Sequence, residues 1–217
     1  MNFTNEVNSR LLNAVHSIFD HAANRANNRI GDTPEEKRDR CVRKDGGYKC
    51  IHLPADHFCS MIGQTLEHRE IAEHDVHKLK FIDIGCGVGE KLYLASLFGM
   101  QSFGLELRKE LIDEGEQLLK SMGHRCTHWS QTPNVAECFI HADGLTYDYK
   151  DFDILYFYCP LVDSNLQIKL EDQIAKTAKI GAIVIPASAS GCFGYGKLPE
   201  GWKAVQGQNT RYFIRES

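Results

Sequence analysis

The feature that most constrains the fold is the stretch 81–90, in which an apolar run leads into an acid and three alternating glycines. It reads Phe-Ile-Asp-Ile-Gly-Cys-Gly-Val-Gly-Glu, and a helical pattern begins immediately after it. Glycines at such positions let backbone N–H groups approach a ligand that a Cβ atom would push away. Dinucleotide-binding folds and plain tight turns also use such strings, so the surroundings of Gly85, Gly87 and Gly89 decide its meaning.

From residue 79 onward, apolar strands alternate with helices, a pattern typical of a parallel sheet covered on both faces. The two final apolar runs flank Gly207 and predict an antiparallel hairpin at the edge of the sheet. The fold class is therefore α/β with a doubly wound, mostly parallel sheet. We predict strands over 80–85, 102–106, 138–141, 153–158 and 181–186, helices over 89–98, 108–121 and 164–178, and hairpin strands over 202–206 and 211–215.

Residues 1–78 follow a different pattern, because they contain helical spacing without strands. Apolar residues at that spacing predict one amphipathic helix over 5–29 and another over 56–69. Between them, residues 31–49 mix both charge signs and contain Gly46-Gly47, which indicates a connector. We therefore expect an N-terminal helical extension before the α/β domain.

Composition excludes several classes of protein. The chain has 217 residues, of which 42% are hydrophobic, so it can bury one sizeable core. Its 25 Lys and Arg against 29 Asp and Glu give a net charge of −4, so it has no general attraction for phosphate backbones, and a nucleic-acid partner is not expected. No apolar run approaches the roughly 18 residues of a membrane span, and no signal segment opens the chain, so we expect a cytoplasmic protein.

The eight cysteines contain no C-x-x-C pair, which argues against a zinc ribbon and a disulfide framework and predicts reduced thiols. Cys50, His52, His57 and Cys59 are metal-ligand residue types close together in the sequence. Their spacing is not that of a standard structural zinc site, and an ordinary helix start with a buried Cys explains it better. No metal is predicted.

Further polar residues follow the predicted strands at their carboxyl ends, where ligands bind in open α/β sheets. Asp83 ends the first strand, and Glu106, followed by Leu107, ends the second. A carboxylate at the second position can accept hydrogen bonds from both hydroxyls of a ribose. Asp143 and Gly144 end the third strand, where the alternative is an Asp that caps a turn before a Gly.

With these residues, the sequence resembles the class I (Rossmann-like) S-adenosylmethionine-dependent methyltransferases over residues 80–215. The terminal hairpin matches the reversed edge strand that these enzymes add to a Rossmann sheet. NAD is the alternative cofactor, but its fingerprint is Gly-x-Gly-x-x-Gly. The resemblance implies that Asp83, Gly85, Cys86, Gly87 and Gly89 lie against the methionine part of the cofactor. It also implies that Glu106 binds the ribose, with Leu107 beside it as a further cofactor contact, and that Asp143 reads the adenine, with Gly144 beside it.

The fourth strand and the loop after it are similar to those of non-SET protein lysine methyltransferases, of the Dot type and the ATP-synthase c-subunit type. The latter pairs a Tyr-rich strand with a following Pro, as in Tyr156 to Pro160. We expect Tyr156 and Phe157 in the core. Tyr158 either packs there too or faces the sulfonium or an incoming amine, because a ring face attracts a cation. Tyr158 and Pro160 are the candidate catalytic residues, and Tyr158 also a cofactor contact.

These features predict an enzyme that transfers a methyl group from S-adenosylmethionine to an N or O nucleophile, with a protein lysine as the leading acceptor. A small-molecule methyltransferase and a non-catalytic S-adenosylmethionine-binding regulatory subunit are the alternatives. Residues 1–78 are then expected to carry a lid whose connector, 31–49, closes over the site, and 79–217 to form the cofactor-binding domain. The Gly-rich segment 187–197 is either coil or a substrate lid.

Overall fold

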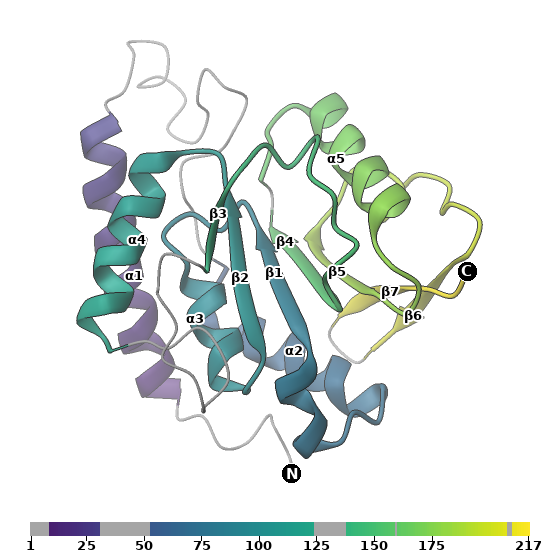
Figure 1. Cartoon of the computed structure of the whole chain (residues 1–217), viewed down its shortest axis with the longest axis horizontal. Coiled ribbons are helices and arrows are strands. Elements are labelled where there is room, and N and C mark those ends of the chain that lie inside the picture. The colour runs from purple at the N-terminus through teal and green to yellow at the C-terminus, as the bar shows by residue number, and fades with distance from the viewer. Residues whose placement is uncertain (1–8, 31–52, 124–137, 159, 208–209) are drawn as a thin grey trace.

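The computed structural model describes residues 9–30, 53–123, 138–158, 160–207 and 210–217 (Figure 1). Its centre is a seven-stranded sheet in the order β3-β2-β1-β4-β5-β7-β6. Neighbouring strands are parallel except where β7 pairs with β5 and with β6. The strands are β1 (Lys80–Ile84), β2 (Gln101–Glu106), β3 (Phe139–His141), β4 (Ile154–Tyr158), β5 (Ile183–Ser188), β6 (Trp202–Gln206) and β7 (Arg211–Arg215).

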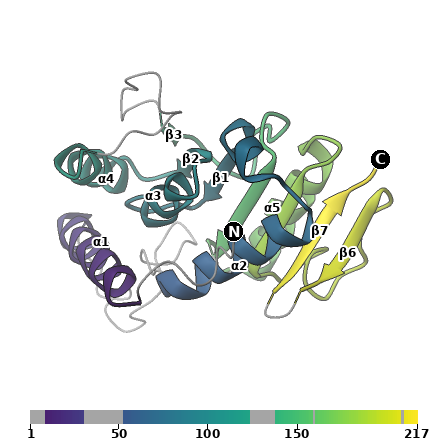
Figure 2. The same ribbon diagram turned by 90° about the horizontal axis from the view of Figure 1, so that it is seen from below.

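The helices lie in two unequal layers on either side of this sheet, as Figure 2 shows. On one face, helices α2, α3 and α4 cover the strands, and α1 packs outside them against α4 and α2. On the other face, α5 and the segment 145–152 form the second layer. The helices are α1 (Ser9–Ile30), α2 (Ala55–His68), α3 (Glu90–Leu97), α4 (Lys109–Ser121) and α5 (Ser164–Thr177), with a short 3-10 helix, η1 (Glu73–Lys78).

The central strands are apolar on both faces because both faces are covered. In β1 every residue after Lys80 is buried, and in β4 the first four residues are buried. Side chains alternate between the two layers, so Tyr156 packs in the core beneath α2 while Phe157 packs in the core beneath α5. The expectation that these two aromatic residues belong to the core is confirmed.

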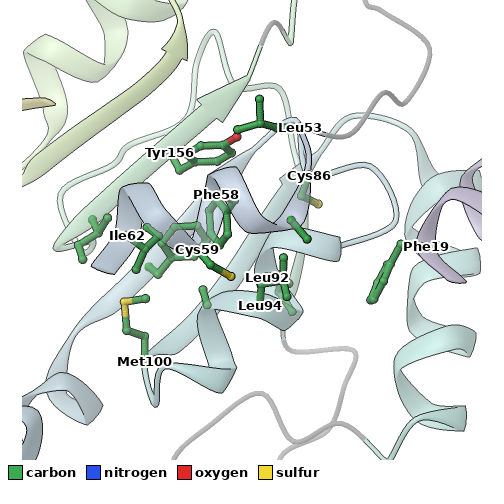
Figure 3. Close-up of a cluster of buried hydrophobic side chains, with 14 of the residues drawn as sticks. Phe19, Leu53, Phe58, Cys59, Ile62, Cys86, Leu92, Leu94, Met100 and Tyr156 are labelled. Atoms are coloured by element: carbon green, nitrogen blue, oxygen red, sulfur yellow. The ribbon is translucent and has the colours of Figure 1, made fainter. Parts of the chain in front are cut away.

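Helix α2 is fixed to the sheet by an aromatic contact. The Phe58 ring meets the Tyr156 ring edge-on at a centroid distance of 5.0 Å, and Figure 3 shows the two rings next to each other in the cluster that also contains Leu92 and Leu94. Such pairs add about 0.5–1.5 kcal/mol beyond the buried area. The N-terminal extension therefore shares a core with the sheet through α2.

The predicted elements are confirmed, with ends that shift by no more than two residues where the structure describes them. The largest shift is at β5, which is displaced to Ile183–Ser188, and the first residues of the helix predicted over 5–29 lie outside the described residues. The sequence patterns missed η1 because it is too short for helical periodicity to show. Among the described residues, no helix is long and apolar enough to cross a bilayer.

The expectation of reduced thiols holds at three described positions and is wrong at a fourth. Cys59, Cys86 and Cys192 are free and buried, whereas Cys138 is disulfide-bonded. Burial raises the pKa of the Cys59 thiol to about 12. That thiol is therefore protonated and unreactive at neutral pH.

Candidate functional site

The glycine loop joins the carboxyl end of β1 to the N-terminus of α3. Gly85, Gly87 and Gly89 all have positive φ, at 79°, 56° and 85°, a region that other residues rarely adopt. The backbone N–H groups of Gly85 and Cys86 donate to the carbonyl of Leu105 at 2.8 and 3.1 Å. These bonds hold the loop against the end of β2, so its shape is fixed by backbone contacts.

Two of the glycines are needed because other chain segments lie against them. A Cβ atom at Gly85 would lie 2.8 Å from Cβ of Pro160, and one at Gly89 would lie 2.8 Å from Cζ of Phe139. The loop that follows β4 therefore touches the start of the glycine loop at Pro160. Phe139, at the start of β3, packs under its end.

Glu106 is a buried carboxylate that links β2 to the glycine loop. Its Oε2 accepts the N–H of Gly87 at 3.0 Å and its Oε1 accepts the N–H of Arg108 at 2.9 Å. Burial raises the pKa of this carboxyl above its usual 4.5, and the N–H groups of Arg108 and Gly87 oppose that rise. A carboxylate offers about four acceptor positions, so Glu106 can still receive hydroxyl donors.

Asp83 and Cys86 occupy different surroundings from each other. Asp83 is the penultimate residue of β1, with only 5% of its surface exposed, in register with Gly104 on one side and Tyr156 on the other. The Cys86 side chain is turned into the core, where a Cβ at Gly104 would lie 2.5 Å from its Sγ. The backbone of Cys86 therefore belongs to the loop, while its thiol fills the space above β2.

Residues after β2 and β3 continue the candidate site along the carboxyl ends of the strands. Leu107 is half exposed, and its carbonyl lies 3.0 Å from the His141 ring nitrogen Nε2. Asp143 is exposed, and its Oδ1 accepts the N–H of Leu145 at 2.9 Å. Asp143 therefore caps the turn before Leu145, which is the alternative role that the sequence indicated for it. Gly144 is fixed by its carbonyl, which accepts the Tyr149 hydroxyl at 2.8 Å.

Tyr158 lies at the exit of β4, half buried and packed on the same side of the sheet as Tyr156. The register between β4 and β5 shifts between Phe157 and Tyr158, so that Tyr158 pairs with Ser188. Such irregularities re-aim a side chain at the end of a strand. Asp83, Glu106, Asp143 and Tyr158 all lie at or just beyond the carboxyl ends of parallel strands, which meet at one edge of the sheet (Figure 1).

The sequence patterns missed a buried charged cluster directly after the glycine loop. Glu90, the first residue of α3, is fully buried, and its carboxylate lies 2.8 Å from both Nδ1 of His16 and Nζ of Lys91. Lys91 also donates to the carbonyl of Leu53. Two charged residues at the start of a helix usually indicate a position that is exposed to solvent. Here the packing of α1 and α2 buries them.

Other predictions fall wholly or partly on residues that the structure does not describe. These include the connector 31–49, Cys50, His52 and Cys159. Of the remaining members of the Cys/His cluster, His57 is exposed and Cys59 is buried. Within the described ranges, no three His, Cys, Asp or Glu side chains are placed to hold a metal ion.

Comparison with solved structures identifies the fold. An RNA methyltransferase from Salinibacter ruber, in complex with S-adenosylhomocysteine, superposes with a TM-score of 0.51 over 77% of this chain and 95% of its own, at 17% identity. A protein from Haemophilus influenzae described as a methylase superposes with a TM-score of 0.52 over 73% of this chain and 98% of its own, at 15% identity. The chain has the class I methyltransferase fold. Its strand order, with β7 reversed between β5 and β6, agrees with the hairpin expected of that fold.

Comparison with curated proteins reaches a smaller part of the chain. The H3 lysine-79-specific histone-lysine N-methyltransferase of Dictyostelium discoideum is 27% identical over 110 residues, which are 48% of this chain and 6% of that protein. This chain thus spans a small fraction of the length of the curated relative it matches. No family model matches the chain.

The residues of this methyltransferase-fold site fit an adenosyl cofactor. Gly85 exposes its backbone at the start of the glycine loop, so a ligand can lie against it without meeting a side chain of that residue. Glu106 is already held as an acceptor by two backbone donors at the end of β2. The negative charge of Glu106 suits the hydroxyls of a ribose and would repel a phosphate attached to them.

Proposed function

We propose that the chain is an S-adenosylmethionine-dependent methyltransferase whose acceptor is the side-chain amine of a protein lysine. The observation that carries the cofactor assignment is the hydrogen bond from the Gly87 N–H to the buried Glu106 carboxylate. It joins the glycine loop to the acid at the end of the next strand, so one rigid unit presents both to a ligand. Its placement at a parallel sheet edge supports a bound ligand there.

Each site residue has a proposed task. Asp83 and the backbone of Gly85 to Gly89 hold the amino-acid part of the cofactor, and Glu106 accepts hydrogen bonds from its ribose. When bound, the cofactor supplies a methyl group carried on a positively charged sulfur, which is a good leaving group. The task left to the chain is alignment, which alone can lower a barrier by about 7–11 kcal/mol. Asp143 and Gly144 lie on the adenine side of this arrangement, and Leu107, beside Glu106, is a further cofactor contact.

Tyr158 and Pro160 are the proposed catalytic residues. Tyr158 is half buried at the exit of β4, where its ring face would attract either the sulfonium or the approaching amine. Pro160 lies against Gly85, so it fixes the path of the chain between the acceptor side and the glycine loop. A lysine amine must reach the site in its neutral form. Burial at this site lowers the pKa of the amine because desolvation disfavours the charged form.

The lysine acceptor rests on two supports. One is the Tyr-rich β4 with its following Pro160. The other is the similarity, over 110 residues, to a protein whose name gives histone lysine as its substrate. The neighbour from Salinibacter ruber is named as an RNA methyltransferase, so RNA is a competing acceptor that an experiment must separate.

A labelled-methyl assay tests the acceptor class. The purified chain is incubated with S-adenosylmethionine carrying a labelled methyl group and a cell extract, which is then divided into protein, RNA and small molecules. We expect label in protein that survives acid hydrolysis as methylated lysine. Label confined to RNA or small molecules contradicts the lysine proposal, and binding without transfer indicates a regulatory subunit. Heat-inactivated chain is the control.

The buried Glu106 predicts how cofactor affinity depends on pH. Because the pKa of Glu106 is raised, its carboxylate takes up a proton at a pH above the usual 4.5. The protonated form accepts hydrogen bonds from hydroxyl groups poorly. We expect the affinity for S-adenosylhomocysteine to fall as the pH decreases, with a midpoint above 4.5. Calorimetric titrations from about pH 7 to 4 measure it.

The stability contribution of Glu106 has the opposite sign. Because the pKa of Glu106 is raised in the folded state, its protonated carboxyl stabilises the fold at a pH below the unfolded-state pKa. This stabilisation is lost as the pH rises through the folded-state pKa. The Glu106→Gln variant controls for both effects, since it should bind weakly and without this pH dependence. A wild-type affinity that does not change with pH, or an affinity that falls equally with pH in the variant, contradicts the role of Glu106.

The division of the chain belongs to the same proposal. Residues 1–78 would form a helical extension that carries a lid for cofactor and acceptor, and 79–217 the cofactor-binding domain. The contacts of His16 with Glu90 and of Leu53 with Lys91 support it, because they attach the extension to the helix that begins at the glycine loop.

A further inference from the structure

Helix α3 begins directly after the glycine loop and is covered by the N-terminal extension. Figure 2 shows α1 and α2 on the same side of the sheet as α3. The ring of Phe19 on α1 lies 5.7 Å from that of Tyr93 on α3, measured between the ring centroids. The N–H of Tyr93 donates to the carbonyl of Gly89 at 3.0 Å, so the first turn of α3 is continuous with the loop. The extension is therefore connected to the last glycine of the loop through α3.

A buried chain of charged contacts crosses the same junction. Oε1 of Glu90 lies 2.8 Å from Nδ1 of His16 on α1, and Oε2 of Glu90 accepts a hydrogen bond from Nζ of Lys91 at 2.8 Å. Lys91 also donates to the carbonyl of Leu53, just before α2, and its Nζ lies 5.7 Å from the centroid of the Phe58 ring on α2. The first two residues of α3 thus contact both helices of the extension.

These contacts hold the glycine loop at a second place. The N–H of Gly87 is already held by Glu106 at the end of β2. Three residues later, Glu90 is held by His16 and Lys91. A binding site that has its bound geometry before the ligand arrives loses less conformational freedom on binding. The contacts of Glu90 can therefore contribute to cofactor affinity without touching the cofactor.

Stability alone does not explain why these charges are buried. The side chains of Glu90 and Lys91 are 0% and 5% exposed. Removing an ion pair from water costs about as much as its attraction returns, and apolar residues of the same volume often stabilise a fold as well. Either charge left alone in the interior is unfavourable, so the pair constrains the elements that carry it to one relative position.

We propose that Glu90 and Lys91 are positioning residues that couple the N-terminal extension to the cofactor site. This inference rests on the S-adenosylmethionine site proposed above. With α1 and α2 packed on α3, the two residues hold the end of the glycine loop in its binding geometry. Because coupling between two sites is reciprocal, a bound cofactor also stabilises the packing of the extension.

Calorimetric titration with S-adenosylhomocysteine tests the effect of the extension on the site. His16→Ala removes the partner of Glu90 on α1, and Lys91→Met removes the hydrogen bond to Leu53. Each variant should bind about tenfold more weakly than wild type. His16→Asn should recover most of the affinity, because its amide NH₂ can take the place of Nδ1 and donate to Glu90. The His16 side chain is 26% exposed, so His16→Ala should fold even if Lys91→Met does not.

Arg25→Met is the matched control. Arg25 also attaches α1 to the α/β domain, but through α4, where its Nη2 lies 2.7 Å from Oε1 of Glu114. Its loss should lower the thermal stability and leave the affinity for S-adenosylhomocysteine within about twofold of wild type. Thermal unfolding shows that each variant is folded at the temperature of the titration.

Hydrogen exchange measured by mass spectrometry tests the effect of the cofactor on the extension. Saturating S-adenosylhomocysteine should slow amide exchange in α1 of the wild type and of Arg25→Met, and should have no effect on α1 of His16→Ala. Wild-type affinity in folded His16→Ala, an equal loss of affinity in Arg25→Met, or α1 exchange that does not respond to the cofactor in the wild type would each overturn the inference. A wild type that does not bind S-adenosylhomocysteine overturns the proposed cofactor site itself.

Discussion

Replacement of Glu106 with alanine should lower the affinity for S-adenosylmethionine by about a hundredfold or more. The change removes a charged acceptor for the ribose and the bond that holds the Gly87 N–H. Each hydrogen bond to a charged group is worth about 1.5–3 kcal/mol, and every 1.4 kcal/mol corresponds to about tenfold in affinity. Isothermal titration calorimetry measures the loss directly.

Glu114→Ala is the matched control for this prediction. Glu114 is buried to a similar degree on α4 and pairs with Arg25, so its loss removes a carboxylate of the same type from the neighbouring helix. It should destabilise the fold and leave cofactor affinity within about threefold. Equal losses of affinity in the two variants would mean that Glu106 acts through general stability. Thermal unfolding of each variant confirms that the folded protein is being measured.

Gly89→Ala should both destabilise the fold and abolish cofactor binding. Its φ of 85° strains any residue with a Cβ, and that Cβ would lie 2.8 Å from Cζ of Phe139. The left-handed strain costs about 1–2 kcal/mol and the overlap about 1–3 kcal/mol more. Because Gly89 is the N-cap of α3, the displaced backbone carries the glycine loop with it. Urea unfolding and calorimetry measure the two effects.

Gly99→Ala isolates the strain from the overlap. Gly99 has a similar φ of 92°, but a Cβ there meets nothing within 4 Å. This variant should lose about 1–2 kcal/mol of stability and bind S-adenosylmethionine normally. If the two variants lose the same stability, contact with Phe139 contributes nothing. Normal binding by Gly89→Ala would remove the glycine loop from the cofactor site.

The sheet could be predicted from the sequence because its strands carry strong local signals. The buried, mostly apolar runs at 81–84 and 154–157 are typical of covered parallel strands, and the glycine string follows directly after the first of them. The hairpin formed by β6 and β7 follows from two apolar runs around a glycine. Short-range patterns therefore predicted the strands and the fold class, whereas the strand order comes from the structure.

Contacts between distant segments could not be read in this way. His16 meets Glu90 across 74 residues, and nothing in the local pattern of either residue indicates that the Glu90 carboxylate is buried. Glu171 looks like one exposed charge of an amphipathic helix until the N–H groups of Ser190 and Gly191 are seen against it. The turn cap at Asp143, by contrast, could be predicted, because the local sequence indicates it and the structure contains it.

The most direct measurement is a crystal structure of the chain grown with S-adenosylhomocysteine, with a parallel crystal grown with NAD. We expect S-adenosylhomocysteine to bind along the glycine loop, with its ribose hydroxyls on the Glu106 carboxylate and its sulfur on the side of Tyr158, and we expect NAD not to bind there. If S-adenosylhomocysteine does not bind at the carboxyl ends of these strands, or if NAD binds there instead, the cofactor assignment is wrong.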